Sequence, residues 1–351
     1  MASLSLPAIS LPTSGRHGAL AAIRTGRTNP TTGTCTGARR LGCLVVFSGR
    51  NLGHPYRNPN GIRAESIDKR EPMVPPYNVL ITGSTKGIGY ALAKEFLKAG
   101  DNVVICSRSA ERVDSAVKSL RKEFGEHHVW GTTCDVREGK DVKALVNFAR
   151  DKLKYIDIWI NNAGSNAYSY KPLVESSDED LMEVVTTNTL GLMICCREAI
   201  NMMLNQPRGG HVFNIDGAGS DGRPTPRFAA YGATKRSVVH LTKSLQAELQ
   251  MNELKNVMVH NLSPGMVTTD LLMSGANTKQ AKFFINILAE PPDVVAEYLV
   301  PCVRSVPSSQ SMKPTYIRFL TGLKAYSQIF SVGNLHLSKT CFWRAKKPIP
   351  N

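Results

Sequence analysis

The sequence predicts an α/β protein: a single domain built on a doubly wound parallel sheet. Short apolar runs rich in β-branched residues alternate with longer stretches in which apolar residues recur at helical spacing. The apolar runs are continuous, which is typical of strands covered on both faces. Strands that alternate with helices form right-handed βαβ units, so the strands are expected to lie parallel in one sheet.

The first half of this domain is expected to alternate three strands with three helices. Each predicted strand is a short apolar run, at 78–82 (NVLIT), 102–107 (NVVICS) and 128–133. The predicted helices follow them at 87–99, 110–123 and 142–153. In the first helix one face is apolar, which indicates packing against the sheet; it carries Ile88, Ala91, Leu92 and Phe96.

The second half of the domain continues the pattern with longer helices. Strands are predicted at 157–161 (DIWIN), 211–215 and 257–262, with helices at 189–204 and 228–248 between them. No internal repeat interrupts the alternation. One domain over 77–331 therefore accounts for the body of the chain.

The composition indicates a soluble globular protein and excludes several other classes. Of the 351 residues, 42% are hydrophobic and 20% are charged, unlike a fully disordered or collagen-like chain. No run of about 18 apolar residues is present, so no transmembrane helix is expected. The net charge of +15 lies mostly at the two ends, which leaves +3 for residues 65–331. A nearly neutral body argues against a nucleic-acid-binding face.

Both ends of the chain differ from the body. Residues 1–64 carry eight Arg and no acid and are rich in Ser and Thr, which is typical of an organelle transit peptide. A plastid peptide over 1–65 is favoured, with a mitochondrial peptide or a plain basic tail as the alternatives. Residues 66–76 are expected to form a linker, in which Pro75-Pro76 marks the entry to the domain. We assign no role to the basic tail 332–351.

The eight cysteines form no recognisable framework. No C-x-x-C pair and no Cys/His cluster with zinc spacing occurs in the sequence. We therefore expect no metal site, and we expect mostly buried, reduced thiols, as in a reducing compartment.

A glycine-rich turn joins the first predicted strand to the first helix. It consists of Thr82, Gly83, Ser84, Thr85, Lys86, Gly87, Ile88 and Gly89. Glycines allow a tight turn and a close approach of backbone to phosphate, and the helix N-terminus offers free N–H groups to a pyrophosphate. Because the turn lies between a strand and a helix at the start of a βαβ unit, it predicts a Rossmann-type dinucleotide site.

The end of the second strand bears on the choice of cofactor. NAD sites usually place an acid there to bind the ribose hydroxyls, but residues 106–109 read CSRS. Arg108 is suited to a 2′-phosphate, and Lys86 in the glycine turn is suited to assist it. NADPH is therefore the predicted cofactor and NADH the alternative. The plainer interpretation is that Arg108 is a solvated loop residue and Lys86 a turn residue.

With these motifs the sequence resembles the short-chain dehydrogenase/reductase family over about 77–270. The match comprises the T-G-x-x-x-G-x-G turn, Asp135-Val136, Asn161-Asn162-Ala163-Gly164, Asn188, Tyr231-x-x-x-Lys235 and Pro264-Gly265. The resemblance implies that Asp135 and Val136 hold the adenine and that the loop Asn162-Ala163-Gly164 lines the cofactor. It also implies that Thr268 meets the nicotinamide amide.

The pair Tyr231 and Lys235 has a chemical meaning of its own, because residues four apart share one helix face. A neighbouring ammonium, together with the positive nicotinamide in the oxidative direction, lowers the pKa of a phenol. Tyr231 is therefore suited to exchange a proton with a substrate oxygen while hydride moves between substrate and nicotinamide. The family resemblance adds that Lys235 holds the cofactor ribose and that Asn188 keeps a water that relays protons to Lys235. An isolated pair at this spacing would otherwise be a surface helix pair.

One loop departs from the family pattern. The family has N-x-S-S after the fifth strand, whereas residues 214–220 read NIDGAGS. Counting from the strand puts Gly217 at the catalytic Ser position, and counting back from Tyr231 puts Ala218 there. Neither has a hydroxyl, so Ser220, a backbone N–H or a water is expected to hold the substrate oxygen, unless the loop is structural only. Asp216 is not expected to do so, since an ionised carboxylate only accepts hydrogen bonds.

Within the family, this loop and the basic start resemble the shorter form of the plant chlorophyll(ide) b reductases. That resemblance implies NAD(P)H-dependent reduction of the formyl group of chlorophyll(ide) b to hydroxymethyl, the first step of chlorophyll b degradation. It also implies a chloroplast location on the stroma side of the thylakoid, with a longer, membrane-anchored homologue as partner.

Two other functions and one surface feature stay open at this point. A plastid 3-oxoacyl-carrier-protein reductase is an alternative that would need the usual Ser, and a non-catalytic subunit that stabilises an active homologue is another. Residues 312–330 place apolar side chains at near-helical spacing among basic ones, which predicts either a peripheral membrane contact or a helix packed on the body or used in an oligomer.

Overall fold

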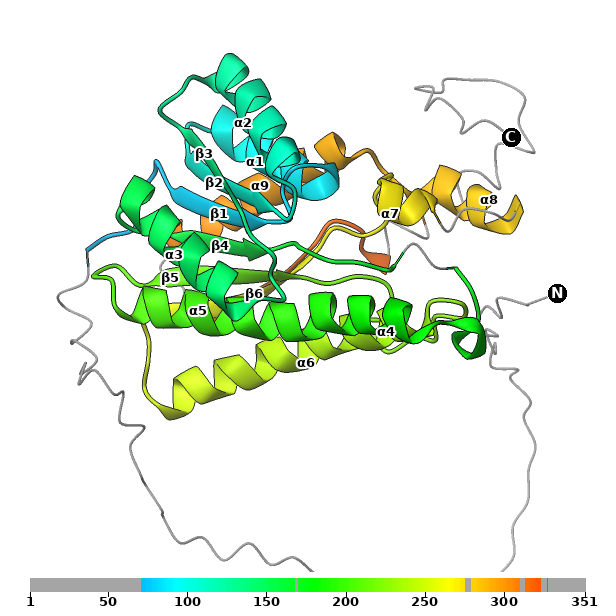
Figure 1. Ribbon diagram of the computed structural model, residues 1–351. Coiled ribbons are helices and arrows are strands. Elements are labelled where there is room, and N and C mark those ends of the chain that lie inside the picture. Colours follow the sequence, from blue (N-terminus) through cyan, green and yellow to red (C-terminus); the bar gives the residue numbers. More distant parts are fainter. Residues whose placement is uncertain (1–70, 168–169, 275–278, 310–312, 323–326, 328–351) are drawn as a thin grey trace, which may run out of the picture. The chain divides into compact units, whose positions relative to one another are not determined.

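The computed structural model describes residues 71–167, 170–274, 279–309, 313–322 and 327, and shows one sheet of parallel strands (Figure 1). The strand order is β3-β2-β1-β4-β5-β6-β7. Their bounds are β1 Asn78–Thr82, β2 Asn102–Ser107, β3 Val129–Thr133, β4 Ile158–Asn161, β5 Gly210–Ile215, β6 Val257–Ser263 and β7 Tyr316–Arg318. Because the chain winds outward from β1 in both directions, the predicted doubly wound fold is confirmed. The predicted leader 1–65, most of the linker and the tail 332–351 lie outside the described residues.

Helices cover both faces of the sheet, which is why its strands are apolar on both sides (Figure 1). On one face lie α1 (Gly87–Lys98), α2 (Ala110–Phe124) and α9 (Pro292–Ser308). On the other lie α3 (Gly139–Leu153), α5 (Leu192–Leu204) and α6 (Ala229–Met251). Neighbouring strand residues alternate between the two cores: Ile81 packs in the first and Leu80 in the second, and both are fully buried.

The structure adds elements that the sequence pattern did not predict. A separate helix α4 (Asp178–Val185) and a π-helical turn η3 (Thr186–Gly191) precede α5, where a single helix from 189 was expected. The short turn η2 (Leu173–Glu175) comes before α4, and α7 (Asp270–Met273), α8 (Lys279–Leu288) and α9 follow β6. The other predicted helices and strands have ends within three residues of those observed.

The helix predicted within 312–330 is wrong at Tyr316–Arg318, which form the edge strand β7. Its residues pair in parallel register with β6, where Leu262 lies opposite Ile317. The pairing satisfies backbone groups that the outer edge of β6 would otherwise expose. Ile317 and Leu320, which looked like one face of a helix, pack instead against the first core.

The described residues bear on three further expectations. Four cysteines are buried free thiols and a fifth is half-buried, which confirms the predicted buried thiols in this part of the chain: Cys106, Cys134, Cys195, Cys196 and Cys302. Across the described ranges, no helix is long and apolar enough to span a membrane. The same ranges contain no cluster of three or more His, Cys, Asp or Glu arranged to hold a metal ion.

Two histidines on neighbouring strands are stacked inside the sheet. His211 of β5 and His260 of β6 lie with ring centroids 5.3 Å apart, and His211 Nδ1 is 3.0 Å from His260 Nε2. His260 Nδ1 accepts a hydrogen bond from the backbone N–H of Thr315, so its Nε2 carries the proton donated to His211. Burial lowers the pKa of His211 to about 4 and, together with the neighbouring His211, that of His260 to about 3. Both rings are therefore neutral in the folded protein near pH 7.

We expect acidification to destabilise the fold through this pair. Between pH 6.5 and 4.5 the unfolded chain binds protons at His211 and His260 that the folded chain does not, so the free energy of unfolding falls as the pH falls. The loss should be about 2–3 kcal/mol per histidine. Urea unfolding across this pH range measures it. The double variant His211→Asn/His260→Asn should show a flatter dependence, and equal slopes for both proteins would contradict the assignment.

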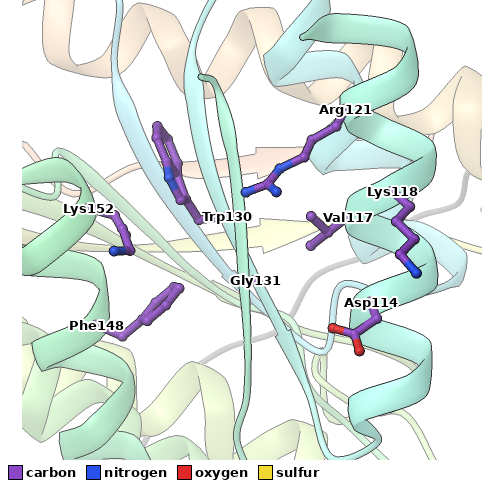
Figure 2. Close-up of a pocket in the computed structure, with 8 residues that line it drawn as sticks. All are labelled: Asp114, Val117, Lys118, Arg121, Trp130, Gly131, Phe148 and Lys152. Atoms are coloured by element: carbon purple, nitrogen blue, oxygen red, sulfur yellow. The ribbon is translucent and has the colours of Figure 1, made fainter. Parts of the chain in front are cut away.

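A cavity of about 330 Å³ lies at the β3 edge of the sheet, between α2, β3 and α3 (Figure 2). Its lining mixes apolar, basic and acidic residues: Asp114, Val117, Lys118, Arg121, Trp130, Gly131, Phe148 and Lys152. Because β3 is four places away from β5 in the sheet, this cavity does not adjoin the carboxyl end of β5, where the candidate active site is found.

Candidate active site

The glycine turn after β1 packs directly on the loop after β4. Gly83 and Gly87 have φ values of +62° and +58°, a region that favours glycine. A Cβ on Gly83 would lie 2.8 Å from Ala163 Cα, and one on Gly89 would lie 2.7 Å from the carbonyl oxygen of Gly83. The turn therefore forms a bare backbone cradle before the N-terminus of α1, as a bound pyrophosphate requires.

Buried hydroxyls and one amide hold the turn in this shape. Thr82 Oγ1 accepts hydrogen bonds from the backbone N–H groups of Asn162 and Ala163, each at 3.1 Å. Asn162 Nδ2 donates to the carbonyls of Thr82 and Gly83, at 2.9 and 2.8 Å. Ser84 Oγ donates to the Ile81 carbonyl at 2.6 Å. Since Thr82 and Ser84 are fully buried, they support the cradle from the protein interior.

The loop after β6 lies beside this turn. A Cβ on Gly87 would be 3.3 Å from Thr269 Cγ2. Gly265, which follows Pro264, has a φ of +72°, and a Cβ there would lie 2.6 Å from Leu320 Cβ, so only glycine fits. The backbone N–H of Thr268 donates to the Glu290 carbonyl at 3.0 Å, which fixes the predicted nicotinamide residue beside the turn.

The two cations predicted near a 2′-phosphate are each held in an exposed ion pair. Arg108 Nη1 donates to Glu183 Oε1 at 3.0 Å, and Lys86 Nζ donates to Asp270 Oδ2 at 2.8 Å. Arg108 keeps about half of its side chain exposed. Exposed ion pairs contribute little stability, so an incoming phosphate can compete for these cations. Glu183 of α4 was not identified from the sequence.

The predicted adenine residues differ in their surroundings. Arg137 binds the Asp135 carboxylate through Nε and Nη2 and also donates to Glu183. Burial alone would raise the pKa of Asp135, but the hydrogen bonds from Arg137 outweigh it and hold that pKa below its usual range. Val136 is buried against Gly191, where a Cβ would lie 2.9 Å from Val136 Cγ2. Asp135 is therefore ionised and already has a cation as partner.

Tyr231 and Lys235 lie on one face of α6, with Lys235 Nζ 5.7 Å from the centre of the phenol ring. Lys235 Nζ donates to the Ile215 carbonyl at 3.2 Å. Burial lowers the pKa of Lys235 to about 8, while the Asp216 carboxylate opposes that change. Burial and the charge of Asp216 raise the pKa of Tyr231 above its usual value. Burial and the Asp216 charge decide the pKa of this phenol, so Tyr231 is protonated at neutral pH, as a proton donor must be.

Asn188 in the π-helical turn η3 joins three parts of the site. Its Oδ1 accepts from the backbone N–H of Ser165 at 2.8 Å, and its Nδ2 donates to the Ser165 carbonyl at 2.7 Å and to Thr234 Oγ1 at 3.0 Å. A Cβ on Gly164 would lie 3.4 Å from Asn188 Oδ1 and 3.7 Å from Lys235 Nζ. The amide thus fixes the loop after β4 against α6, and its Oδ1 keeps a second lone pair for a water.

The loop that departs from the family pattern brings Gly217 to the phenol. A Cβ on Gly217 would lie 2.6 Å from Tyr231 Oη, whereas Ala218 is exposed. Of the two ways to place the missing Ser, counting from the strand therefore matches the structure. Ser220 is buried, and its Oγ donates to Asp216 Oδ2 at 3.2 Å. Because a hydroxyl has one proton, Ser220 would have to release Asp216 before it could donate to a substrate oxygen.

Asp216 is the centre of a cluster that sequence reasoning missed. Its carboxylate is 3% exposed, and its Oδ2 also accepts a hydrogen bond from the hydroxyl of Tyr316 in β7. Tyr316 could not be placed there because its segment was expected to be helical. The signal that could have found the cluster is Asp216 itself, an acid where the family has Ser.

Aromatic side chains line the approach to Tyr231. The ring centroid of Phe228 lies 6.5 Å from that of Tyr231 and 4.8 Å from that of Tyr170. The Arg227 guanidinium lies 5.3 Å from the centre of the Tyr170 ring. Phe228 and Tyr231 also border a small cavity of about 20 Å³ beneath α4 residues such as Leu181.

Comparisons with known proteins identify the family to which this domain is similar. The family model described as short chain dehydrogenase matches residues 77–280. Chlorophyll(ide) b reductase NOL, chloroplastic, is 86% identical in Oryza sativa subsp. japonica, over 77% of this chain and 81% of the relative. The protein of the same name in Arabidopsis thaliana is 81% identical over 84% of each. The probable chlorophyll(ide) b reductase NYC1, chloroplastic, of Oryza sativa subsp. japonica is 47% identical over 71% of this chain and 51% of its own length.

Solved structures share the fold of the domain. An actinorhodin polyketide ketoreductase variant with NADPH aligns with a TM-score of 0.60 and 26% identity, over 71% of this chain and 97% of that one. A 3-ketoacyl-(acyl-carrier-protein) reductase from Brucella melitensis complexed with NADH aligns with a TM-score of 0.59 and 27% identity, over 70% and 97%.

Proposed function

This chain belongs to the short-chain dehydrogenase/reductase family, and on that premise we propose that it is a chlorophyll(ide) b reductase. The proposed reaction uses a nicotinamide cofactor to reduce the formyl group of chlorophyll(ide) b to hydroxymethyl. The observation that carries the proposal is the identity of 81% or more to two relatives of that name over most of both chains. The geometry of Tyr231, Lys235 and Asn188 agrees with it.

The nicotinamide cofactor would supply hydride to the formyl carbon, and this chain would supply the proton. Tyr231, protonated at neutral pH, donates that proton to the developing alkoxide oxygen. Lys235 holds its charge beside the phenol and binds the cofactor ribose. Asn188 fixes the loop after β4 and orients a water towards Lys235. No metal is required, because hydride addition and proton donation complete the reduction.

The cradle formed by the glycine turn suits a dinucleotide, since glycines at 83 and 89 let its backbone pack on the loop after β4 with no side chain in the way, directly before the N-terminus of α1. We propose that the cofactor lies across this cradle, with the adenine near Asp135 and Val136 and the nicotinamide near Thr268. The residues proposed to bind it directly or through the turn are Thr82, Gly83, Ser84, Lys86, Gly87, Ile88, Gly89, Arg108, Asp135, Val136, Asn162, Ala163, Gly164, Tyr231, Lys235, Pro264, Gly265 and Thr268. NADPH is the preferred form in this proposal.

The preference for NADPH leads to a test at Arg108. We expect Arg108→Asp to weaken NADPH binding more than NADH binding, by about 1–3 kcal/mol, because a charge-assisted contact to the 2′-phosphate is lost. Titration of each coenzyme by fluorescence measures both Kd values. Arg112→Asp, in the first turn of α2, is the matched control and should change neither. Equal weakening of both coenzymes would remove Arg108 from the phosphate site.

The location and the partners are also proposals. We propose that the protein acts in the chloroplast, at the stroma side of the thylakoid as a peripheral protein, together with a longer, membrane-anchored homologue. Exposed apolar side chains around α4 and α5 offer a surface for an oligomer or for that homologue: Val174, Met182, Val185, Leu190 and Met193. We propose no nucleic-acid partner.

The decisive experiment incubates the purified protein with chlorophyllide b and NADPH and follows formation of the hydroxymethyl product. Product formation that depends on NADPH would support the proposal. Reduction of a 3-oxoacyl-carrier-protein substrate with no effect on chlorophyllide b would favour the acyl reductase alternative. Activity that appears only on addition of the longer homologue would indicate a non-catalytic, stabilising subunit.

A further inference from the structure

A buried carboxylate lies between the two proposed catalytic side chains and the edge of the sheet. Asp216 immediately follows Ile215, whose carbonyl accepts the hydrogen bond from Lys235 Nζ at 3.2 Å. It immediately precedes Gly217, where a Cβ would lie 2.6 Å from Tyr231 Oη. The backbone that carries Asp216 therefore contacts both side chains, and a negative charge at this position acts on both.

Hydroxyl groups from three segments hold this carboxylate. Oδ2 accepts from Ser220 Oγ at 3.2 Å and from the hydroxyl of Tyr316, and Ser263 at the end of β6 also bonds to the carboxyl group. Hydrogen bonds to a buried carboxylate favour its charged form. Burial raises the pKa of Asp216 above its usual value, and the bonds from these hydroxyls and the nearby Lys235 offset only part of the rise.

The charged and titratable groups around Asp216 come from two elements. From α6 the nearby groups are Lys235 and Tyr231, and from β7 they are Tyr316 and the Arg318 guanidinium, 3.9 Å from the centre of the Tyr316 ring. Lys235 is only 6% exposed, so its ammonium form is costly without a nearby anion. The pair of serines that the family has at 216 and 217 would carry no charge.

We propose that Asp216 is a positioning residue that keeps Lys235 charged and fixed beside Tyr231, and that Tyr316 of the edge strand β7 holds Asp216 in its ionised form. Asp216 does not touch the substrate in this scheme. The inference rests on the proposed function only for the identity of the substrate. It explains why this loop has an acid where the family has Ser.

The test compares Asp216→Asn and Tyr316→Phe with the wild type. The matched control is Asp221→Asn, which removes a carboxylate from the same loop that is paired with Arg223 at the surface. The first readout is the pH dependence of the Kd of NADPH, followed by coenzyme fluorescence. The second is the pH profile of kcat for chlorophyllide b reduction, and the third is Tm.

Removal of the Asp216 charge should make Lys235 and Tyr231 lose their protons more readily. The alkaline decline of NADPH affinity and of kcat should therefore move to a pH lower by about one unit or more in Asp216→Asn. Tyr316→Phe keeps the carboxylate but removes a donor, so Asp216 binds a proton at higher pH. In that variant the acidic decline of both quantities should move to higher pH while the alkaline decline stays in place.

Unchanged pH profiles in both variants, with only Tm lowered, would overturn the proposal and leave Asp216 a structural residue. A shift of the same size in Asp221→Asn would overturn it as well, because the effect would then be general electrostatics. If the wild type does not reduce chlorophyllide b, the proposed function fails. The Kd profile still tests the role of Asp216, because it needs no pigment.

Discussion

Tyr231→Phe is expected to lower kcat at least about a hundredfold, because the general acid of the reduction is lost. The change removes one hydroxyl and leaves the ring, so the packing of α6 and the Kd of NADPH should stay close to wild type. Steady-state reduction of chlorophyllide b measures the loss, with coenzyme fluorescence and Tm as checks on binding and fold. Tyr170→Phe is the matched control and should retain activity. The Tyr170 ring packs on Phe228, with ring centroids 4.8 Å apart.

A Tyr231→Phe variant that keeps more than about a tenth of the wild-type rate would remove Tyr231 as the proton donor. A variant that loses NADPH binding together with activity would show instead that the hydroxyl supports the cofactor site. The two outcomes separate because the Kd of NADPH is measured without the pigment. This is the most direct test of the proposed chemistry, since it changes one atom at the reacting centre.

The parts of the site that depend on local pattern were predictable from the sequence. The glycine turn, the strand before it and α1 after it are adjacent in the chain, and Tyr231 and Lys235 are four residues apart on one helix. Spacing alone therefore places these residues. The glycines required by the packing at 83 and 89 were predicted for the same reason, although their contact with the loop after β4 was not.

Contacts between distant segments could not be predicted in the same way. Tyr316 reaches Asp216 from 100 residues further along the chain. That contact exists because β7 pairs with β6, and a three-residue strand carries too little periodicity to distinguish it from one turn of a helix. The link from Arg108 to Glu183 likewise needed α4, a helix that was not predicted. Asp216 was set aside because an ionised carboxylate only accepts hydrogen bonds, and its contacts with Tyr316 and its nearness to Lys235 could not be read from the sequence.

The position that replaces the missing catalytic Ser could not be decided from the sequence either. Counting from the end of β5 gave Gly217, and counting back from Tyr231 gave Ala218. The structure places Gly217 against Tyr231 and leaves Ala218 exposed. A Cβ at 217 would lie 2.6 Å from Tyr231 Oη and 3.2 Å from Lys235 Cγ. Real Cβ atoms essentially never approach another heavy atom within 3.0 Å, so a side chain there must push the phenol oxygen away by several tenths of an ångström, up to about 1 Å. Glycine at 217 therefore lets the phenol lie where the structure places it.

Gly217→Ser, which restores the residue that the family has, is expected to lower kcat about a hundredfold, since a displacement of about 1 Å at a reacting group has an effect of that size. NADPH binding should change little, because the glycine turn is untouched. Ala218→Ser adds the same hydroxyl one residue further on and should stay near the wild-type rate. The pair thus tests both ways of placing the missing Ser in one experiment. A Gly217→Ser variant as active as the wild type, or more so, would show that the phenol moves freely and that a serine hydroxyl is accepted as a second donor to the substrate oxygen.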